Sequence, residues 1–517
     1  MKRKVIAMCL TAIMTTGAFA AQELRMPGMF SEGMVLQRDM PVPVWGAAHP
    51  GATVAVSLLG QKETATADEQ GRWRVTLKPL AATAERQSLL VAATHETVIP
   101  IPNTKQTGKI KTEEFLLYTN VLVGEVWIVC GQSNALMAVA SSDGFDAMKA
   151  EAPKYEFIRT AQISRRNAHT VKEPQDDVQS YWGPVKWEDS RYSALRNTTS
   201  DIPGGCSAIS YYFARELSKA FSAKGEVIPI GMLEATNIIR VESWIAPEAA
   251  AADPVMKEFA GKGYPWATGR SYLANIGPLV PYAMRGAIYY QGEMNAGDLN
   301  YRHGLNALIR SWRAAWGSEF PFLVVQLPGF IEHKAGTDAR LDMDASTLKA
   351  IAGNDEKHGF ITVREAQRRA ARENPNVGLA VTIDLGHPTD IHPPRKREVA
   401  ERLALLARRL AYGEKDLAAE APSPTETTFS GNTCRVRFAN ANGGLVVNGK
   451  DATGFELAGA DGVFKPATAA VKDDTVTITA TEVTAPTAVR YAWRGYPEWS
   501  LKNAAGLPAT PFRYPEE

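Results

Sequence analysis

The stretch Gly124-Glu-Val-Trp-Ile-Val-Cys-Gly-Gln-Ser133-Asn134 predicts how the chain is organised. Residues 126–130 are uncharged and apolar, which predicts a buried strand, and Gly131 permits a sharp turn before a helix that we expect from Ala135. A serine at such a junction lies at the carboxyl edge of a sheet and beside the first amides of a helix, so Ser133 can act as a nucleophile near oxyanion donors. A helix N-cap is the alternative role, and the local sequence favours neither.

A second polar stretch, Asp384-Leu-Gly-His387-Pro-Thr-Asp390-Ile-His392-Pro-Pro, precedes a predicted helix at 395–412. A serine nucleophile needs a base that takes its proton and a carboxylate that orients the base. His392 and Asp390 supply both on one loop. By themselves they would be interpreted as a surface histidine and a turn cap, and only the pairing with Ser133 favours catalytic roles.

These two stretches and Tyr290-Gln-Gly-Glu-Met-Asn295 resemble the sialate O-acetylesterase family, which belongs to the SGNH (GDSL-type) hydrolases. Flanking segments extend the resemblance over nearly the whole chain after its first residues: Met34-Val-Leu-Gln-Arg38 with Pro43-Val-Trp45-Gly46, and Gly506-Leu-Pro-Ala-Thr-Pro-Phe-Arg513. The resemblance implies an SGNH-hydrolase-like three-layer α/β/α domain with a mostly parallel sheet. It also implies a serine carboxylic ester hydrolase that acts on acetylated sugars.

The pattern of apolar residues independently predicts an α/β core between two β-rich regions. Short strands fill 24–102, strands alternate with helices through 121–413, and strand alternation returns after residue 414. The polar segment 103–114 is expected to form an exposed loop or hairpin. The domains that we expect are a signal peptide at 1–20, an N-terminal β-sandwich domain at 21–115, an SGNH hydrolase catalytic domain at 116–415 and a C-terminal β-rich region at 416–517.

The candidate site lies at the carboxyl ends of the predicted parallel strands, because open α/β sheets bind their ligands there. Ser133, Gln291 and His392 are all expected at this edge. An oxyanion needs hydrogen-bond donors, which we expect to be the Ser133 amide, a second backbone amide and a side-chain amide. Gln291 or Asn295 is the candidate for the side-chain amide, and Glu293 is expected to hold their loop.

The chain departs from the family where the second backbone donor belongs. Members usually carry Gly-Gly-Thr there, whereas this chain has Thr236-Asn-Ile-Ile-Arg-Val-Glu-Ser-Trp244. Only a backbone amide is required, so Asn237 or Ile238 is the candidate donor. Arg240 is a further charge near the site that could bind an anionic substrate or pair with Glu242, and the pairing is slightly preferred because surface ion pairs are ordinary.

Two further alternatives concern the base and the sugar. Relatives often carry the aspartate three residues before the histidine, so Asp384 is an alternative orienter of His392. The polar run 159–203 is expected to form a rim loop that contacts substrate. Four aromatic side chains are candidates for stacking on sugar rings, or else for the core: Tyr181, Trp182, Trp187 and Trp244.

Composition indicates an ordinary globular protein. The chain has 517 residues, 45% of them hydrophobic and 22% charged, and a formal net charge of +1. Nothing in this balance points to nucleic acid or to an anionic membrane surface. Eight histidines show no ligand pairing such as His-Glu-x-x-His, and the cysteines match no zinc motif. We therefore expect no metal and no cofactor, and the sequence leaves the oligomeric state open.

The first residues predict export. A basic segment, 1–4, is followed by a short apolar segment, 5–19, and by small residues that predict cleavage after Ala20. The apolar segment is too short to span a bilayer, so we expect a periplasmic or secreted protein without membrane insertion. Cys9 leaves with the signal peptide, and the odd number of remaining cysteines leaves at least one thiol free.

The resulting hypothesis is an exported carbohydrate O-acetylesterase, similar to the sialate O-acetylesterases, with a Ser133-His392-Asp390 acyl-enzyme mechanism. An acetylesterase acting on xylan or pectin in polysaccharide degradation is the first alternative. A catalytically impaired glycan-binding relative is the second, which the altered segment at 236–244 favours and the retained serine, histidine and aspartate oppose. A lipase lacks support because the Gly-x-Ser-x-Gly motif is absent.

Overall fold

The computed structural model describes residues 23–163, 182–184, 206–263, 267–331 and 358–516. Contacts between residues divide the chain into two compact units. Of the described residues, one unit comprises 23–26, 44–76 and 89–117, and the other comprises those within 27–43, 77–88 and 118–516. All candidate site residues belong to the second unit.

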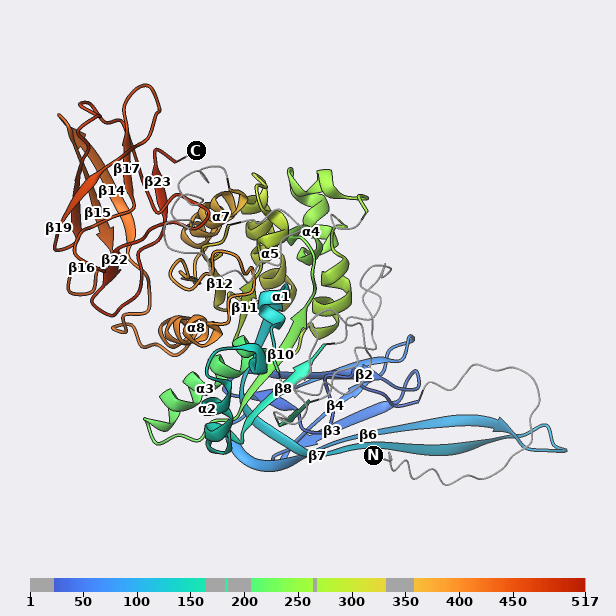
Figure 1. Ribbon diagram of the computed structural model, residues 1–517. Helices are drawn as coiled ribbons and strands as arrows, with labels where there is room; N and C mark the ends of the chain where they lie inside the picture. Colours follow the sequence, from blue (N-terminus) through green and yellow to red (C-terminus); the bar gives the residue numbers. More distant parts are fainter. Residues whose placement is uncertain (1–22, 164–181, 185–205, 264–266, 332–357, 517) are drawn as a thin grey trace. The chain divides into compact units, whose positions relative to one another are not determined.

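The first unit is built from antiparallel strands. Its strands, four of which include residues of the second unit, are β2 (Val42–Ala47), β3 (Thr53–Leu58), β4 (Gln61–Thr66), β5 (Arg72–Leu77), β6 (Thr83–Pro100) and β7 (Thr107–Gly131). Strand β3 lies between β4 and β6, and β2 pairs with β5. Beyond these pairs β6 and β7 form a long hairpin (Figure 1), so the segment at 103–114 contains the turn of a hairpin, one of its two expected forms.

A parallel sheet forms the centre of the second unit. Its order is β13-β12-β11-β7-β10-β8-β9, and all neighbours are parallel except β8 and β9. Short strand β1 also pairs with β7 in parallel. The bounds are β1 Val35–Gln37, β8 Ile158–Gln162, β9 Trp182–Pro184, β10 Ile230–Thr236, β11 Gly286–Tyr290, β12 Phe322–Val325 and β13 Val377–Ala380.

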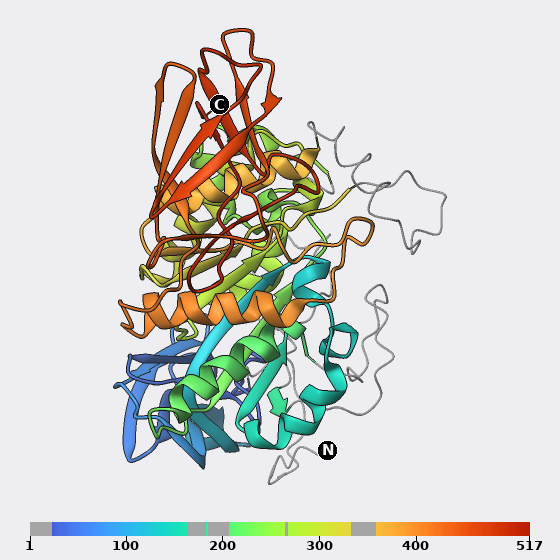
Figure 2. The same ribbon diagram turned by 60° about the vertical axis from the view of Figure 1, so that its left-hand side comes forward.

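Helices pack on this sheet in two groups. Helices α3 and α8 lie side by side (Figure 2), and α5 packs with α7; α7 and α8 both contact β13. The helices are α1 (Ser133–Leu136), α2 (Phe145–Glu151), α3 (Ala208–Ser222), α4 (Pro247–Ala252), α5 (Tyr301–Trp316), α7 (Gly359–Glu373) and α8 (Lys396–Ala411). The predicted α/β class with a mostly parallel sheet is confirmed.

Local sequence explains the ends and faces of the long helices. Ser207 caps α3 by accepting a hydrogen bond from the amide of Ser210. Helix α5 buries the apolar positions Leu305, Leu308 and Trp312, which recur every three or four residues. It ends at Gly317, whose φ of +61° is the left-handed conformation that glycine adopts at a helix C-terminus.

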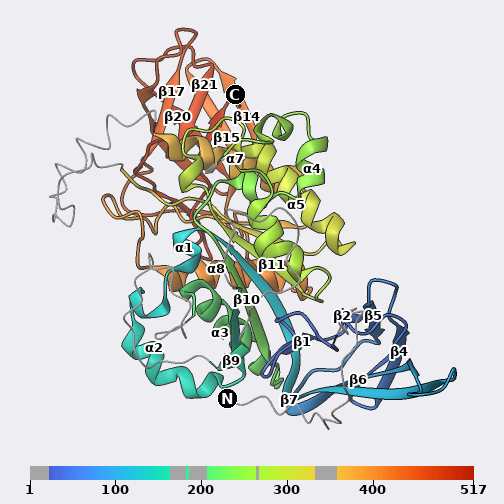
Figure 3. The same ribbon diagram turned by 90° about the vertical axis from the view of Figure 1, so that its right-hand side faces the viewer.

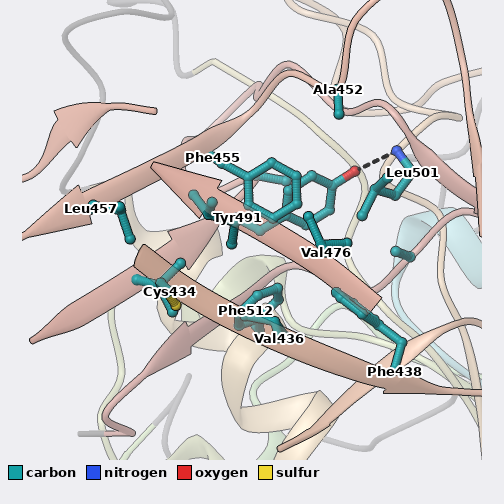
Figure 4. Close-up of a cluster of buried hydrophobic side chains, with 14 of the residues drawn as sticks. Cys434, Val436, Phe438, Ala452, Phe455, Leu457, Val476, Tyr491, Leu501 and Phe512 are labelled. Atoms are coloured by element: carbon teal, nitrogen blue, oxygen red, sulfur yellow. Dashed lines mark hydrogen bonds between the residues drawn. The ribbon is translucent and has the colours of Figure 1, made fainter. Parts of the chain in front are cut away.

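The C-terminal strands form two four-stranded sheets that share one hydrophobic core. The sheet orders are β14-β15-β20-β19 and β18-β17-β21-β23, and β16 pairs with β22. In this core Phe455 lies against Tyr491, whose hydroxyl accepts a hydrogen bond from the Leu501 amide (Figure 4). The bounds are β14 Ser423–Ser430, β15 Thr433–Ala439, β16 Leu445–Val447, β17 Phe455–Ala458, β18 Lys465–Pro466, β19 Thr468–Lys472, β20 Thr475–Thr479, β21 Ala488–Tyr491, β22 Leu501–Asn503 and β23 Phe512–Tyr514.

Two details of the secondary structure differ from expectation. The helix after the serine turn is only four residues long, begins at Ser133 itself, and is followed by a single 3₁₀ turn at Val139–Ser141. The polar run at 159–203 begins inside β8, and residues 182–184 form the edge strand β9. Tyr181 and Trp187 lie outside the described residues. No helix in the described ranges has the length and apolar character that crossing a membrane requires.

Candidate active site

The structure brings Ser133 and His392 together. Figure 3 shows α1 directly after the end of β7, and Ser133 is the first residue of this helix. Its Oγ lies 2.7 Å from Nε2 of His392, although 259 positions separate the two residues in the sequence. Ser133 is partly exposed and His392 is exposed, so a substrate can reach both side chains. This distance is the one that proton transfer between a nucleophile and its base requires.

Gly131 allows β7 to turn towards this position. Its φ of +139° is a conformation that other residues rarely adopt, and a Cβ there would lie 1.9 Å from the carbonyl oxygen of Tyr290. The following residue, Gln132, donates from its amide to that same carbonyl at 3.1 Å. Its Oε1 accepts hydrogen bonds from the amides of Gly292 and Met294. The serine turn is therefore attached to the loop after β11.

Asp390 contacts the backbone of His392, in contrast to the expected contact with its ring. One carboxylate oxygen accepts a hydrogen bond from the His392 amide at 2.8 Å. An aspartate side chain readily bonds the amide two residues on, and this local turn competes with any longer reach. This contact holds the loop of the base, and the role of Asp390 as the orienter of the imidazole stays a prediction.

The pKa of His392 lies below its ordinary value. Partial loss of hydration around the ring is the main cause, because it disfavours the charged form, and the positive charge of Lys396 acts in the same direction. The negative charge of Asp390 opposes both by stabilising the imidazolium. The imidazole is consequently neutral at pH 7 and can accept a proton.

Asp390→Asn should separate the two roles of this carboxyl group. Asparagine keeps an oxygen for the His392 amide but removes the charge, so we expect kcat to fall by about tenfold or less and the acid limb of the pH profile to move to lower pH. The sign follows from the charge, since loss of the negative charge lowers the pKa of His392 further. A loss of about 10⁴-fold, as for a ring-bound orienter, would contradict the backbone role.

The alternative orienter, Asp384, is committed elsewhere. Its two carboxylate oxygens each lie 2.6 Å from the guanidinium of Arg402 on α8. Such a bidentate pair is strong and geometrically specific. Asp384 thus anchors α8 to the segment that follows β13. Its alternative role as the orienter of His392 is corrected.

The side-chain amides of Gln291 and Asn295 are used inside the protein. Gln291 donates to the side-chain oxygen of Asn295 at 2.8 Å and to the carbonyl of Ile239 at 3.3 Å. Asn295 donates to the carboxylates of Asp298 and Glu242. Both residues are fully buried, and buried amides must satisfy their own hydrogen-bonding groups. The expectation that either amide serves the oxyanion is corrected: they join the loops after β10 and β11.

The altered segment at 236–244 is similarly engaged. The backbone amide of Asn237 donates to the carbonyl of Gly131 at 2.9 Å, and its side chain donates to Ser271, so its assignment as an oxyanion donor is corrected. Ile238 stays a prediction. Arg240 pairs with Glu242 at 3.1 Å, as preferred from the sequence, and with Asp298. These pairs occupy the charge that the alternative assigned to an anionic substrate.

Trp244 belongs to the core. Its side chain is 0% exposed and lies edge-on to Tyr289, and its carbonyl accepts a hydrogen bond from the indole of Trp312. A buried ring cannot stack on a sugar, so the substrate role of Trp244 is corrected. The side chain of Trp182 in β9 lies outside the described residues.

Asn134 and Lys396 were not singled out from the sequence, yet both lie beside the Ser133–His392 pair. Asn134 donates to Glu293 and to the carbonyl of Ile391, and it accepts from the ammonium group of Lys396 at 2.7 Å. Lys396 is the first residue of α8. A cation at a helix N-terminus is opposed by the helix dipole, and this was the available signal in the sequence.

An α/β fold with a serine–histidine pair at the carboxyl ends of its parallel strands is the arrangement that serine hydrolases use. No family model matches the chain. A solved structure of a carbohydrate acetylesterase, XAC1771 from Xanthomonas citri, is 33% identical, covers 95% of this chain and 100% of its own, and has a TM-score of 0.75. Sialate O-acetylesterases of Pongo abelii and Homo sapiens are each 27% identical over 455 residues, covering 81% of this chain and 77% of theirs. The chain belongs to the sialate O-acetylesterase family.

Proposed function

We propose that the protein is a carbohydrate O-acetylesterase in which Ser133 is the nucleophile and His392 the general base. The observation that carries this proposal is the 2.7 Å distance between Ser133 Oγ and His392 Nε2. The names of its relatives, carbohydrate acetylesterase and sialate O-acetylesterase, support the acetyl group and the sugar as parts of the substrate. The signal peptide expected at 1–20 supports a periplasmic or secreted location for this activity.

The proposed reaction has two steps. The proton of the Ser133 hydroxyl passes to Nε2 of His392 while Oγ bonds to the acetyl carbonyl carbon. The bond between that carbon and the sugar oxygen then breaks, and His392 returns the proton to the sugar hydroxyl. A water molecule then gives a proton to His392 while its oxygen attacks the acetyl carbon of the acetyl-serine. His392 passes this proton to Oγ of Ser133, which releases acetate and restores the serine.

The oxyanion of the intermediate needs donors that are already in place. Ser133 is the first residue of α1, and the first amides of a helix have no partner inside the helix. We therefore assign its own amide as the first donor and retain Ile238 as the candidate for a second.

Release of acetate from a panel of acetylated glycans tests this function. Purified protein is incubated with O-acetylated sialic acid, acetylated xylo-oligosaccharides and acetylated pectic oligosaccharides, and acetate is quantified enzymatically. The expected result is catalytic release from at least one of them, and the best substrate separates sialate from plant polysaccharide specificity. No release from any member, by folded protein, would overturn the proposal.

A glycan-binding protein without activity is the second candidate, favoured by the engagement of the Asn237 amide with Gly131. This candidate predicts saturable binding of an acetylated glycan in calorimetry together with no acetate release. The same panel therefore distinguishes the two functions.

A further inference from the structure

Lys396 is a buried cation next to the serine–histidine pair. The residue is 0% exposed, and its Nζ donates to the carbonyl of Pro393 at 2.6 Å and to Asn134 Oδ1 at 2.7 Å. It also lies over the ring of Tyr290, 5.5 Å from the centroid. Lysine is almost never fully buried, because its charge loses hydration. A cation at the first residue of a helix is also disfavoured by the helix dipole, so this position carries two energetic costs. Such a cost indicates a role other than stability.

The contacts of Asn134 connect this lysine to both reacting residues. Asn134 directly follows Ser133 in the chain, and its Nδ2 donates to the carbonyl of Ile391 at 3.0 Å. Lys396 donates to the carbonyl of Pro393. The carbonyls of the residues before and after His392 are thus both held by side chains. Asn134, next to the nucleophile, holds the first carbonyl, and Lys396, which bonds to Asn134, holds the second.

The amide of Asn134 has one allowed orientation. Its oxygen faces Lys396, which can only donate, and its nitrogen faces the carboxylate of Glu293 at 2.6 Å and a backbone carbonyl, which accept. An aspartate at position 134 would place a carboxylate oxygen, which accepts hydrogen bonds, against the Glu293 carboxylate and the Ile391 carbonyl, which also accept. The Lys396–Asn134–Glu293 network therefore specifies this residue type by its hydrogen bonding.

Charge in the network acts on the base. Burial lowers the pKa of Lys396 to about 7, while the negative charges of Glu293 and Asp390 raise it. Burial in turn raises the pKa of Glu293, which Asn134 and Lys396 lower. The titratable groups that face Lys396 are thus Tyr290 at the end of β11, Glu293 on the loop after it, and Asp390 and His392 on the loop before α8. When protonated, Lys396 disfavours the imidazolium of His392.

We propose that Lys396 and Asn134 are positioning residues that clamp the backbone on both sides of His392 and hold its ring against Ser133. This inference rests on the proposed function of the pair. It assigns to a backbone clamp a part in orienting the base, beside the bond between the Asp390 carboxylate and the His392 amide.

Steady-state kinetics of the full-length protein with its best acetylated sugar tests the clamp. Lys396→Met keeps the apolar length of the side chain but removes the donors and the charge. We expect kcat to fall about 10²-fold with KM changed less than threefold, since misplacement of a reacting group by about 1 Å costs this much. The acid limb of the pH profile should move to higher pH, because loss of the cation raises the pKa of His392.

Arg395→Met is the matched control. Arg395 is the adjacent residue, and its exposed side chain bonds to Glu398 and to the carbonyl of Asp384, so its loss removes a cation but no contact of Asn134 or His392. We expect wild-type kcat and an unchanged acid limb from this variant. Wild-type kcat and pH profile in Lys396→Met would overturn the inference.

Asn134→Asp decides the question if Lys396→Met does not fold. It changes the volume little, and the new oxygen repels Glu293 and the Ile391 carbonyl. A fall of tenfold or more in kcat at an unchanged melting temperature supports the clamp, and an unaltered kcat overturns it. An inactive wild type would instead remove the proposed function, whereas an active wild type with fully active variants removes only the clamp.

Discussion

Ser133→Ala is expected to lower kcat/KM for the acetylated sugar by about 10⁴-fold or more. Removal of a serine nucleophile leaves only the contribution of binding and of the oxyanion donors, and losses of this size are typical of such enzymes. The sugar ester is the informative substrate because an activated aryl ester reacts readily without the enzyme. Acetate release under saturating and subsaturating substrate gives kcat and kcat/KM separately.

Ser318→Ala is the control for this change. Ser318 is an exposed serine after α5 and lies outside the candidate site. We expect wild-type rates from it, and melting temperatures of both variants within a few degrees of wild type. More than a tenth of wild-type activity in a folded Ser133→Ala protein would show that another group attacks the ester.

His392→Ala is expected to lower kcat/KM by a similar factor. Without the imidazole, the serine hydroxyl keeps its proton and is a weak nucleophile. His303→Ala, an exposed histidine on α5, is the control and should retain wild-type activity. If His392→Ala retains more than a hundredth of the wild-type rate, then a different base serves Ser133.

The pH profile of the wild type carries the same information. Only neutral His392 accepts the proton, so kcat/KM should fall tenfold per pH unit below the pKa of this residue. Burial places that pKa below the ordinary value of about 6.5, and the rate should therefore be level through pH 7. An acid limb centred well above 6.5 would contradict the lowered pKa of this base.

Much of the fold was predictable from local pattern. The apolar run 126–130 is the end of β7, and β10, β11, β12 and β13 lie within 121–413, where strands were expected to alternate with helices. Strands β10, β11 and β12 are buried on both faces, which leaves a largely continuous apolar signal in the sequence. The length of the helix after Ser133 was not predictable, because its end depends on packing against α3 and β10 and not on a local stop signal.

The partners of polar side chains were predictable only in part. Asp390, Gln291 and Asn295 lie in the motifs that the sequence singled out, but each bonds to a group other than the reacting ring or oxyanion. Burial imposes this outcome, because an amide or carboxylate enclosed by protein takes whichever complementary group lies within about 3 Å. Sequence spacing does not contain those distances.

The sequence by itself determined the α/β core, the glycine turn before Ser133 and the two loops that carry the candidate nucleophile and base. Local backbone preference and apolar periodicity are enough for these features, since they act over a few residues. Only the tertiary structure decided that Ser133 meets His392 across 259 residues, and that Lys396 and Asn134 hold the backbone on both sides of the base. Those contacts depend on the order of the strands and on burial, and neither can be obtained from residue spacing.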